Sequence, residues 1–337
     1  MPVARGRPSR RSVLEALDRA VSDLAAVGGL PLPTEAEAIW KGIWHEETHH
    51  STAIEGNTLL LRQVEILLEE GKAVGDKELR EYLEVRAYAD AANWVYTQAV
   101  QRGEWRAEGS LSLTEVRECH RFVVEPVWQQ FPPDSLDPRE GPGSFRRRDI
   151  APFARGMQPP PFADVPPQMD DWLARAQAGP GVYPHSMCFL ASIHAAFERI
   201  HPFRDGNGRA GRLILNLLLV RHGYPPAIIR RRDRDRYLAA LHRADIGDPA
   251  LLAEMLARSV KNSIDRFLLP ALAGPLRLVP LTALADDLLS HNALGVAAKR
   301  GRLRAIRKRD QWYSTRQWVD EYKASRYKRT SRVSPQS

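Results

Sequence analysis

The chain has 337 residues, a mass of 38.0 kDa and a formal net charge of +8. No apolar run approaches the ~20 residues of a membrane-spanning helix, so we expect no membrane segment. Residues 1–12 are basic, but no apolar segment of the secretory type follows them. Cys119 and Cys188 are the only cysteines and have no metal-binding spacing, so we expect buried thiols and a cytoplasmic protein.

The positive charge is unevenly distributed along the chain. Residues 299–332 contain 13 Lys and Arg but only 3 Asp and Glu, whereas the rest of the chain is slightly acidic. A concentrated basic segment attracts polyanions such as nucleic acids. Any nucleic-acid binding is therefore expected in the C-terminal tail.

Helical periodicity and helix-ending residues predict an all-α fold followed by a small mixed domain. The expected helices span residues 13–27, 35–54, 58–70, 76–102, 113–124, 165–178, 184–200, 213–220, 230–244 and 251–269. The expected C-terminal elements are helices at 281–289 and 291–300, strands near 304–306 and 311–313, and a helix beginning at Trp318. Five parts follow from this pattern: a disordered basic tail (1–12), a helical region (13–110), a helical core (111–270), a small C-terminal domain (276–326) and a disordered tail (327–337). The Pro-rich stretch 126–142 is expected to be loop.

Residues 201–212, HPFRDGNGRAGR, connect two of the expected helices and combine several kinds of chemistry. Pro202 disfavours helical backbone at His201, so the preceding helix should end with His201 at its tip. Gly206, Asn207 and Gly208 allow a turn that opens the next helix, where backbone N–H groups suit a phosphate.

Four side chains of this stretch extend the interpretation. Asp205 is a candidate ligand for Mg²⁺, and Arg209 and Arg212 lie one turn apart, where both suit phosphates. His201 is within reach as a general base. The stretch therefore predicts a site for nucleotide phosphates with a base beside it.

The expected helix 35–54 carries two competing signals. His45, Glu46 and His49 match the H-E-x-x-H pattern, which on a helix suits zinc with Glu46 as base. Ser51 and Glu55 share a face further along, and Gly56 ends the helix.

The pattern H-x-F-x-[D/E]-G-N-G-R-x-x-R is the motif of the Fic family, which this chain resembles. Every fixed position is matched, by His201, Phe203, Asp205, Gly206, Asn207, Gly208, Arg209 and Arg212. The resemblance implies a Fic-type helical bundle with a small β-hairpin flap. It also implies transfer of AMP from ATP, with Mg²⁺, to a Ser, Thr or Tyr hydroxyl of a protein target.

Ser51, Glu55 and Gly56 resemble the family's inhibitory motif [S/T]-x-x-x-E-[G/N]. The resemblance implies that this helix lies over the ATP site and that Glu55 pairs with Arg212. That pairing would occupy the place of the γ-phosphate and prevent productive ATP binding.

Three further regions resemble functional parts of the family. The segment 143–150 resembles the flap, which implies that residues from Ile150, Ala151 and Pro152 to about Phe153 lie over the nucleotide and pair with the target backbone as an added strand. Tyr237 and Asp245 stand where the family places its adenine-side and ribose-side residues.

The C-terminal order of helix, helix, two strands and helix resembles winged helix-turn-helix domains of the excisionase type. The resemblance implies that the second helix enters a major groove and that the wing contacts phosphates. The candidate DNA contacts are Lys299, Arg300, Arg302, Arg304 and Arg307.

Several functions remain open from the sequence. The first is an autoinhibited adenylyltransferase with a DNA-binding tail, and the second is a nucleotide-sensing DNA-binding transcription regulator. A zinc peptidase using His45, Glu46 and His49 is a third alternative, and removal of AMP with Glu55 positioning water is a fourth. The target, self-modification and a homodimer are equally open.

Overall fold

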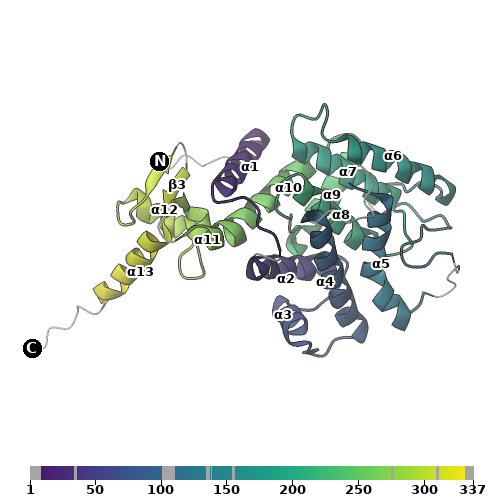
Figure 1. The fold of residues 1–337 in the computed structure, drawn as a ribbon, viewed down its shortest axis with the longest axis horizontal. Helices are drawn as coiled ribbons and strands as arrows, with labels where there is room; N and C mark the ends of the chain where they lie inside the picture. The colour runs from purple at the N-terminus through teal and green to yellow at the C-terminus, as the bar shows by residue number, and fades with distance from the viewer. Residues whose placement is uncertain are drawn as a thin grey trace, which may run out of the picture. The chain divides into compact units, whose positions relative to one another are not determined.

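The computed structural model describes residues 9–33, 36–100, 111–133, 137, 139–153, 156–274, 277–308 and 311–330, without the side chains of 100 and 327–330 (Figure 1). The described residues are mainly helical, which confirms the predominantly helical class that the sequence predicts. They divide into a larger unit within residues 1–17 and 32–260 and a smaller unit within residues 18–31 and 261–337. Helix α1 (Arg10–Ala25) contributes to both units.

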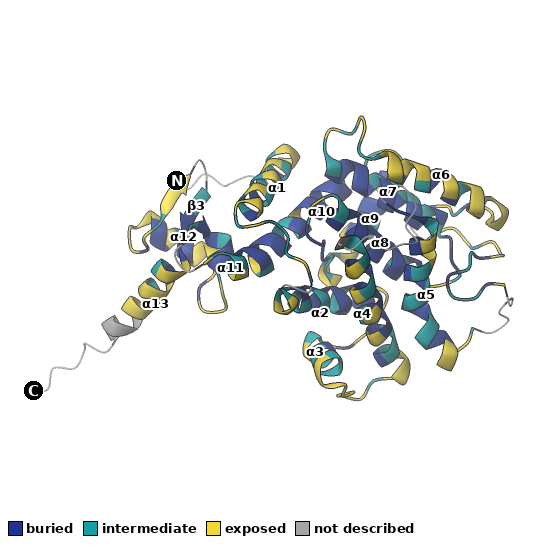
Figure 2. Cartoon of the chain, in the orientation of Figure 1, coloured by how far each residue is buried: buried dark blue, intermediate teal, exposed yellow. Residues whose placement is uncertain are grey.

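The larger unit is a bundle built around a central helix, α8 (Asn207–Arg221). The other helices of this bundle are α2 (Glu37–Ile54), α3 (Leu61–Glu70), α4 (Leu79–Val100), α5 (Leu113–Gln130), α6 (Val165–Ala178), α7 (Ser186–Ile200), α9 (Arg234–Asp245) and α10 (Ala250–Ser263), with single turns η1 (Phe162–Asp164) and η2 (Arg231–Asp233). Helix α8 packs against α2, α4, α5 and α7 and is buried along most of its length (Figure 2).

The apolar positions of α7 explain why the chain folds this way around the motif. Phe189, Ile193, Phe197 and Ile200 recur at helical spacing, as predicted, and all four are buried. Each fully buried side chain of this kind stabilises the fold by roughly 1.5–3 kcal/mol. The packing fixes the end of α7, and with it the start of the connection to α8.

Helices α5 and α8 each differ from the prediction at one end. Helix α5 continues through Pro126 to Gln130, where a loop was expected. A proline inside a helix costs about 3 kcal/mol, but the buried Val123, Val124 and Trp128 around it offset that cost by packing. Helix α8 begins at Asn207, six residues before the expected start, because the glycine turn itself forms the first helical turn.

Both chain ends are more ordered than expected where the structure describes them. Residues 10–12 were expected to be disordered, but they belong to α1, whose start is stabilised by hydrogen bonds from the Ser12 and Val13 amides to Ser9. Residues 327–330 were also expected to be disordered, but they lie in α13 (Arg316–Thr330). Residues 1–8 and 331–337, the rest of the expected tails, lie outside the described residues.

The smaller unit contains a three-stranded antiparallel sheet in the order β1-β3-β2. Strand β3 (Gln311–Ser314) lies between β1 (Val279–Pro280) and β2 (Ile306–Lys308), with Ile306 opposite Tyr313 and Val279 opposite Ser314. The helical elements are η3 (Ile264–Leu268), α11 (Leu269–Leu272), η4 (Leu281–Leu284), α12 (His291–Lys299) and α13. The expected helix 281–289 is wrong, since only the single turn η4 forms.

Candidate functional site

The backbone at the end of α7 turns sharply at His201. His201 caps α7 in the left-handed region, with φ of 49°, and it is the one non-glycine residue with positive φ among the described residues. Such a conformation costs a non-glycine residue energy and persists only where the surroundings impose it. The predicted end of the helix at this histidine is therefore confirmed.

The Asn207 side chain holds the loop between the two helices. Its Oδ1 accepts a hydrogen bond from the Phe203 amide at 2.9 Å, and its Nδ2 donates to the Phe203 carbonyl at 2.8 Å. The Phe203 ring is fully buried. The loop is thus fixed before any ligand binds, by an amide whose side chain faces the protein.

Two further residues brace this loop, and sequence reasoning missed both roles. His120 of α5 accepts a hydrogen bond from the Gly143 amide at Nδ1, so Nε2 carries the proton and donates to the Asp205 carbonyl at 2.9 Å. Its ring stacks on Phe203 with centroids 3.7 Å apart. Burial lowers the pKa of His120 to about 4, which keeps this arrangement neutral.

Arg146 is the second brace. Its guanidinium is buried and donates to the carbonyl oxygens of His201 and Arg148, at 3.0 and 2.9 Å, and to that of Pro160. Its own amide donates to the Pro202 carbonyl at 2.9 Å. These bonds tie the segment after Gly143 to the backbone of the motif.

The protonation state of His201 follows from its hydrogen bond. Nδ1 lies 3.3 Å from the Glu198 carbonyl oxygen, which only accepts, so Nδ1 carries the proton and Nε2 carries the lone pair. Burial lowers the pKa of His201 to about 4, against the weaker opposite effect of the Glu198 bond. The predicted base is therefore neutral at neutral pH.

The N-terminus of α8 offers donors to an anion. Gly206 caps the helix with φ of 74°, and the amides that follow it precede the first intrahelical hydrogen bond, from Ala210. Arg209 is buried, and its Nε and Nη1 have no hydrogen-bond partner in the part of the chain that the structure describes. Unsatisfied buried donors beside a helix N-terminus fit a phosphate.

Glu55 and Arg212 meet at the same place, although 157 residues separate them. Nη2 of Arg212 donates to Oε1 of Glu55 at 2.8 Å, and Nε donates to the Ser51 hydroxyl at 2.7 Å. Burial would raise the pKa of Glu55, but the charge and hydrogen bond of Arg212 outweigh it and lower that pKa. The end of α2 is therefore held to α8 by an ionic contact.

Gly208 allows this close approach. A Cβ atom at position 208 would collide with Oε1 of Glu55. The Glu55 carboxylate thus lies directly over the first turn of α8, against the amides that suit a phosphate. Gly56, which follows it, has φ of 110° and lets the chain leave α2.

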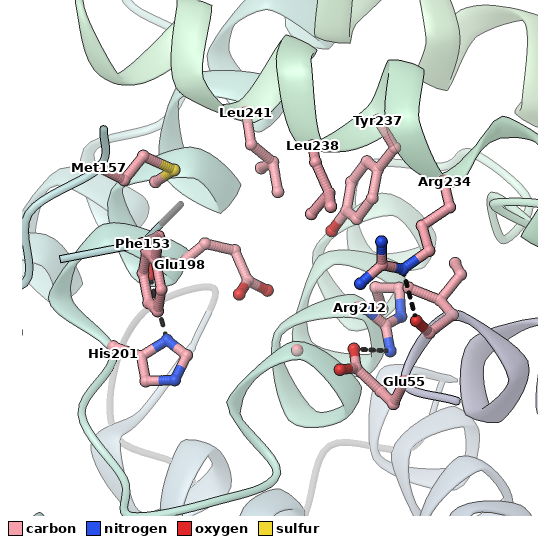
Figure 3. Close-up of a pocket in the computed structure, with 12 residues that line it drawn as sticks. Glu55, Phe153, Met157, Glu198, His201, Arg212, Arg234, Tyr237, Leu238 and Leu241 are labelled. Atoms are coloured by element: carbon pink, nitrogen blue, oxygen red, sulfur yellow. Dashed lines mark hydrogen bonds and ion pairs between the residues drawn. The ribbon is translucent and has the colours of Figure 1, made fainter. Parts of the chain in front are cut away.

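A pocket of about 480 Å³ lies beside these groups (Figure 3). Figure 3 shows His201 and Phe153 on one side of it and Glu55, Arg212 and Arg234 on the other. The lining residues are Ile54, Glu55, Phe153, Met157, Glu198, His201, Gly208, Arg212, Arg234, Tyr237, Leu238 and Leu241. Its mixture of apolar walls and a few convergent polar groups is typical of small-molecule sites.

Tyr237 lies in this pocket, whereas Asp245 does not. The Tyr237 ring is buried, and its hydroxyl lies 2.6 Å from Nε2 of His194. Asp245 pairs with Arg199 at 3.2 Å and is not among the residues that line the pocket. The predicted ribose-side placement of Asp245 is therefore not seen in the pocket.

The expected β-hairpin flap is wrong for the residues that the structure describes between 139 and 160. No strand forms in that region, and Ile150, Ala151 and Pro152 do not line the pocket. Arg146 directs its backbone amide to the motif loop, and Pro152 has no amide to donate. Phe153, the last residue of the range expected over the nucleotide, does line the pocket. Met157 lines it as well, and the Phe153 amide donates a hydrogen bond to the Met157 carbonyl at 2.9 Å.

The remaining candidate metal ligands do not form a cluster. Among the described residues, no group of three or more His, Cys, Asp or Glu side chains is placed to hold a metal ion. His45 lies 3.8 Å from Glu69, and the His49 ring packs on His50. Glu46, the proposed base of a zinc site, is buried beside them. Asp205 is half exposed, and its Oδ1 accepts from the Gly206 amide at 2.6 Å.

Comparisons with known proteins agree with this geometry. Residues 110–219 match the model of the Fic/DOC family. This segment is similar to a Fic domain. A Fic-domain signalling protein from Bacteroides thetaiotaomicron has a similar fold, with a TM-score of 0.60 and 25% identity over 74% of this chain and 96% of that protein. The C. elegans Fic-1 structure has a TM-score of 0.61 and 27% identity over 77% of this chain and 71% of that chain.

Relatives of the Fic domain extend the match beyond residues 110–219. A protein named Protein adenylyltransferase Fic from Nematostella vectensis is 32% identical over 269 residues, which are 79% of this chain. The match covers 58% of that relative, and 42% of its counterpart from Aedes aegypti, so the chain spans about half the length of these relatives. Among the described helices, none combines the length and apolarity that crossing a bilayer requires.

Proposed function

We propose that this protein is an adenylyltransferase that moves AMP from ATP to a hydroxyl group of a protein and that Glu55 restrains it through Arg212. The observation that carries the proposal is the pocket in which a neutral histidine faces a helix N-terminus. The names of the Fic relatives support the same chemistry.

The reaction places few demands on the protein beyond positioning and charge. Nε2 of His201 takes the proton of a Ser, Thr or Tyr hydroxyl as the oxygen attacks the α-phosphorus, and pyrophosphate leaves. Amides of residues 207–209 and the Arg209 guanidinium stabilise the negative charge of the phosphates. Tyr237, whose hydroxyl group is hydrogen-bonded to His194, and Leu241 line the part of the pocket that we assign to the nucleoside.

Mg²⁺ is implied by the chemistry of nucleoside triphosphates. Asp205 fits the ion because its half-exposed carboxylate keeps lone pairs beyond those used by Gly206 and Arg209. One carboxylate together with phosphates and water is a common way to hold this ion. Bound there, the ion would neutralise phosphate charge, and the Asp205 side chain would keep it beside the α8 N-terminus.

The proposed restraint by Glu55 follows from competition between its carboxylate and the γ-phosphate for Arg212. Arg212 donates to Glu55 and to Ser51, so it has no Nη2 or Nε donor left for a γ-phosphate. The Glu55 carboxylate also lies over Gly208, where it repels phosphate. A nucleotide must therefore displace Glu55 to bind with all its phosphates on α8.

Labelling with ATP tests this function. Wild-type protein, Glu55→Gly and Glu55→Gly/His201→Ala are incubated with α-labelled or γ-labelled ATP, and intact masses are measured. We expect the AMP adduct with the α label to form fastest in Glu55→Gly, more slowly in wild type and least in the double variant. Label from the γ position would indicate phosphate transfer and would contradict the proposal.

A second function, DNA binding, is favoured by one observation in the smaller unit. Helix α12 is followed by strands β2 and β3, and exposed basic residues lie at the end of α12, in the connection after it and on β2. These residues are Lys299, Arg300, Arg302, Arg304, Arg307 and Lys308. A helix followed by a basic wing fits a major groove and its phosphates, and an electrophoretic shift with duplex DNA at several salt concentrations tests it. Such binding would also suit a regulator that only senses nucleotide, which the labelling experiment separates.

A further inference from the structure

Glu198 is a buried carboxyl group in the pocket that the chemistry above does not use. It lies on α7, one turn before His201, and only 8% of the residue is exposed. Figure 3 shows its carboxyl group directed into the space between His201 and Arg212. Its Oε1 has no hydrogen-bond partner in the part of the chain that the structure describes.

Charged and titratable groups from four helices face Glu198. Among the described residues, none of them makes a hydrogen bond to its Oε1 atom. Arg212 of α8 is bonded to Glu55 and Ser51. His194, on α7 itself, lies 3.9 Å from Oε1, beyond hydrogen-bond distance, and its Nε2 pairs with Tyr237 of α9. The groups that face Glu198 are Glu55 of α2, Arg212 of α8, Tyr237 of α9, and His194 and His201 of α7.

The neighbouring helix, α8, leaves space for the Glu198 carboxyl group. A Cβ atom at Gly211 of α8 would collide with Oε1 of Glu198, so only glycine leaves room for the carboxyl group here. Burial raises the pKa of Glu198 to about 8; the charge of Arg212 opposes the shift and that of Glu55 adds to it. At neutral pH the group is therefore mostly a neutral carboxylic acid, which has an O–H to donate.

We infer that Glu198, in its protonated form, contacts the bound nucleotide and donates a hydrogen bond to an oxygen at its ribose and α-phosphate end. The inference rests on the proposed function, because the position of the α-phosphate is defined by the base. Residues three apart on a helix lie about 5–6 Å from each other, so Glu198 reaches the same end of the ligand as His201. An ionised carboxylate there would repel the phosphates, whereas the acid completes the polar wall of the pocket.

Binding of ligand fragments tests this contact. Glu55→Gly serves as the reference protein, and it is compared with Glu55→Gly/Glu198→Gln and Glu55→Gly/Glu198→Ala by calorimetric titration with AMP and, separately, with inorganic pyrophosphate. The Gln side chain keeps the shape and an N–H donor, and it also guards against loss of the fold, which thermal unfolding monitors. We expect Glu198→Ala to weaken AMP binding about tenfold and Glu198→Gln to weaken it less than about threefold.

The pH dependence of AMP binding shows whether Glu198 acts as a hydrogen-bond donor or only contributes to the shape of the pocket. AMP affinity of the reference protein should fall as pH rises past about 8, since Glu198 then ionises, and the Gln variant should show no such loss. The loss begins at or below that pH because the reference protein lacks the Glu55 charge. Pyrophosphate affinity should be equal in the reference and Glu198→Ala proteins.

Each other outcome overturns the inference. Equal AMP affinities in the three proteins, or the same alkaline loss in the Gln variant, would exclude the hydrogen bond. If the substitution weakened only the binding of pyrophosphate, Glu198 would contact the β- and γ-phosphate end of the nucleotide and not the ribose and α-phosphate end. Absence of any nucleotide binding by Glu55→Gly would overturn the proposed function as well, so the two failures are distinguishable.

Discussion

Oε1 of Glu55 accepts a hydrogen bond from Nη2 of Arg212 at 2.8 Å, and the same carboxylate lies over Gly208. The contact joins the end of α2 to the first turns of α8. In the site proposed for a triphosphate, the Glu55 carboxylate therefore occupies both the Arg212 guanidinium and the space beside the N-terminus of α8.

Replacing Glu55 should release the site. Glu55→Gly frees Arg212 and removes a carboxylate from the N-terminus of α8. AMP transfer should therefore rise about tenfold or more. A tenfold change corresponds to ~1.4 kcal/mol, the free energy that ATP no longer spends on displacing Glu55. The rate of adduct formation from α-labelled ATP measures it. Glu37→Gly is a matched control, since Glu37 is an exposed carboxylate at the start of the same helix. Equal rates in both variants would mean that Glu55 is no brake.

Ser51 should contribute a smaller part of the restraint. Its hydroxyl accepts from Nε of Arg212 at 2.7 Å, and a hydrogen bond of this kind contributes about 1 kcal/mol. Ser51→Ala should therefore raise transfer several-fold, between wild type and Glu55→Gly. Transfer by Ser51→Ala that equals or falls below the wild-type rate would argue that the hydroxyl does not hold Arg212 in its paired position.

His201 should be required, and its titration should be displaced. Substitution by alanine should lower transfer by about 10²–10⁴-fold through loss of the base, whereas His291→Ala, at an exposed position, should have no effect. A base acts when neutral, and burial lowers the pKa of His201 to about 4. In Glu55→Gly, kcat/KM should therefore stay level as pH falls through ~6.5, the ordinary histidine value. An acid limb at that ordinary value would contradict the buried geometry.

Glu47 should make stability depend on pH. This fully buried carboxyl of α2 accepts hydrogen bonds from Tyr88 and Tyr96 of α4 and from Asn216 of α8, and burial raises its pKa to about 7. The folded state then binds the proton more tightly than the unfolded state, whose reference value is 4.5, so this group's contribution to stability is lost as pH rises from 4.5 to about 7.

Denaturant unfolding of wild type and Glu47→Gln across that range measures the effect. The free energy of unfolding of the variant should fall less steeply with pH than that of wild type, because the amide does not ionise. Glu37→Gln, an exposed change on the same helix, should follow the wild-type curve. Parallel curves for all three proteins would show that Glu47 does not titrate in this window.

The basic wing should bind duplex DNA in a salt-dependent way. Arg302→Glu/Arg307→Glu reverses two exposed charges and should reduce the salt slope of binding by about 1 for each lost phosphate contact. Arg304 is unsuitable for this test, because its guanidinium stacks on Trp318 at 4.1 Å and supports the fold. Arg62→Glu, at an exposed position of α3, is the control. Equal affinities and slopes in all three proteins would reject DNA binding.

The sequence alone determined the helices around the motif and the residue types of the site. Period-3.6 apolar spacing and a proline after His201 fixed the end of α7, and the motif pattern singled out Glu55 and Arg212 as partners. The helix pattern is a local feature, so residues that are neighbours in the chain are enough to predict it. The Glu55–Arg212 pair could be predicted because both residues belong to motifs of known spacing. The loop expected after Pro126 was partly wrong because packing outweighed local propensity there. The expected tails were partly wrong because α1 begins with hydrogen bonds to Ser9 and α13 continues to Thr330.

Only the tertiary structure decided which distant groups share the pocket. The roles of Arg146, His120 and Glu198 depend on backbone carbonyls, ring stacking and a missing Cβ at Gly211, which no spacing in the sequence encodes. The same holds for the segment after Gly143, where the Arg146 amide donates to the Pro202 carbonyl of the motif loop and no strand forms in the described residues. Hydrogen bonding and burial are set by groups far apart in the chain, so a carboxyl group that looks ordinary in the sequence becomes a neutral acid in the fold.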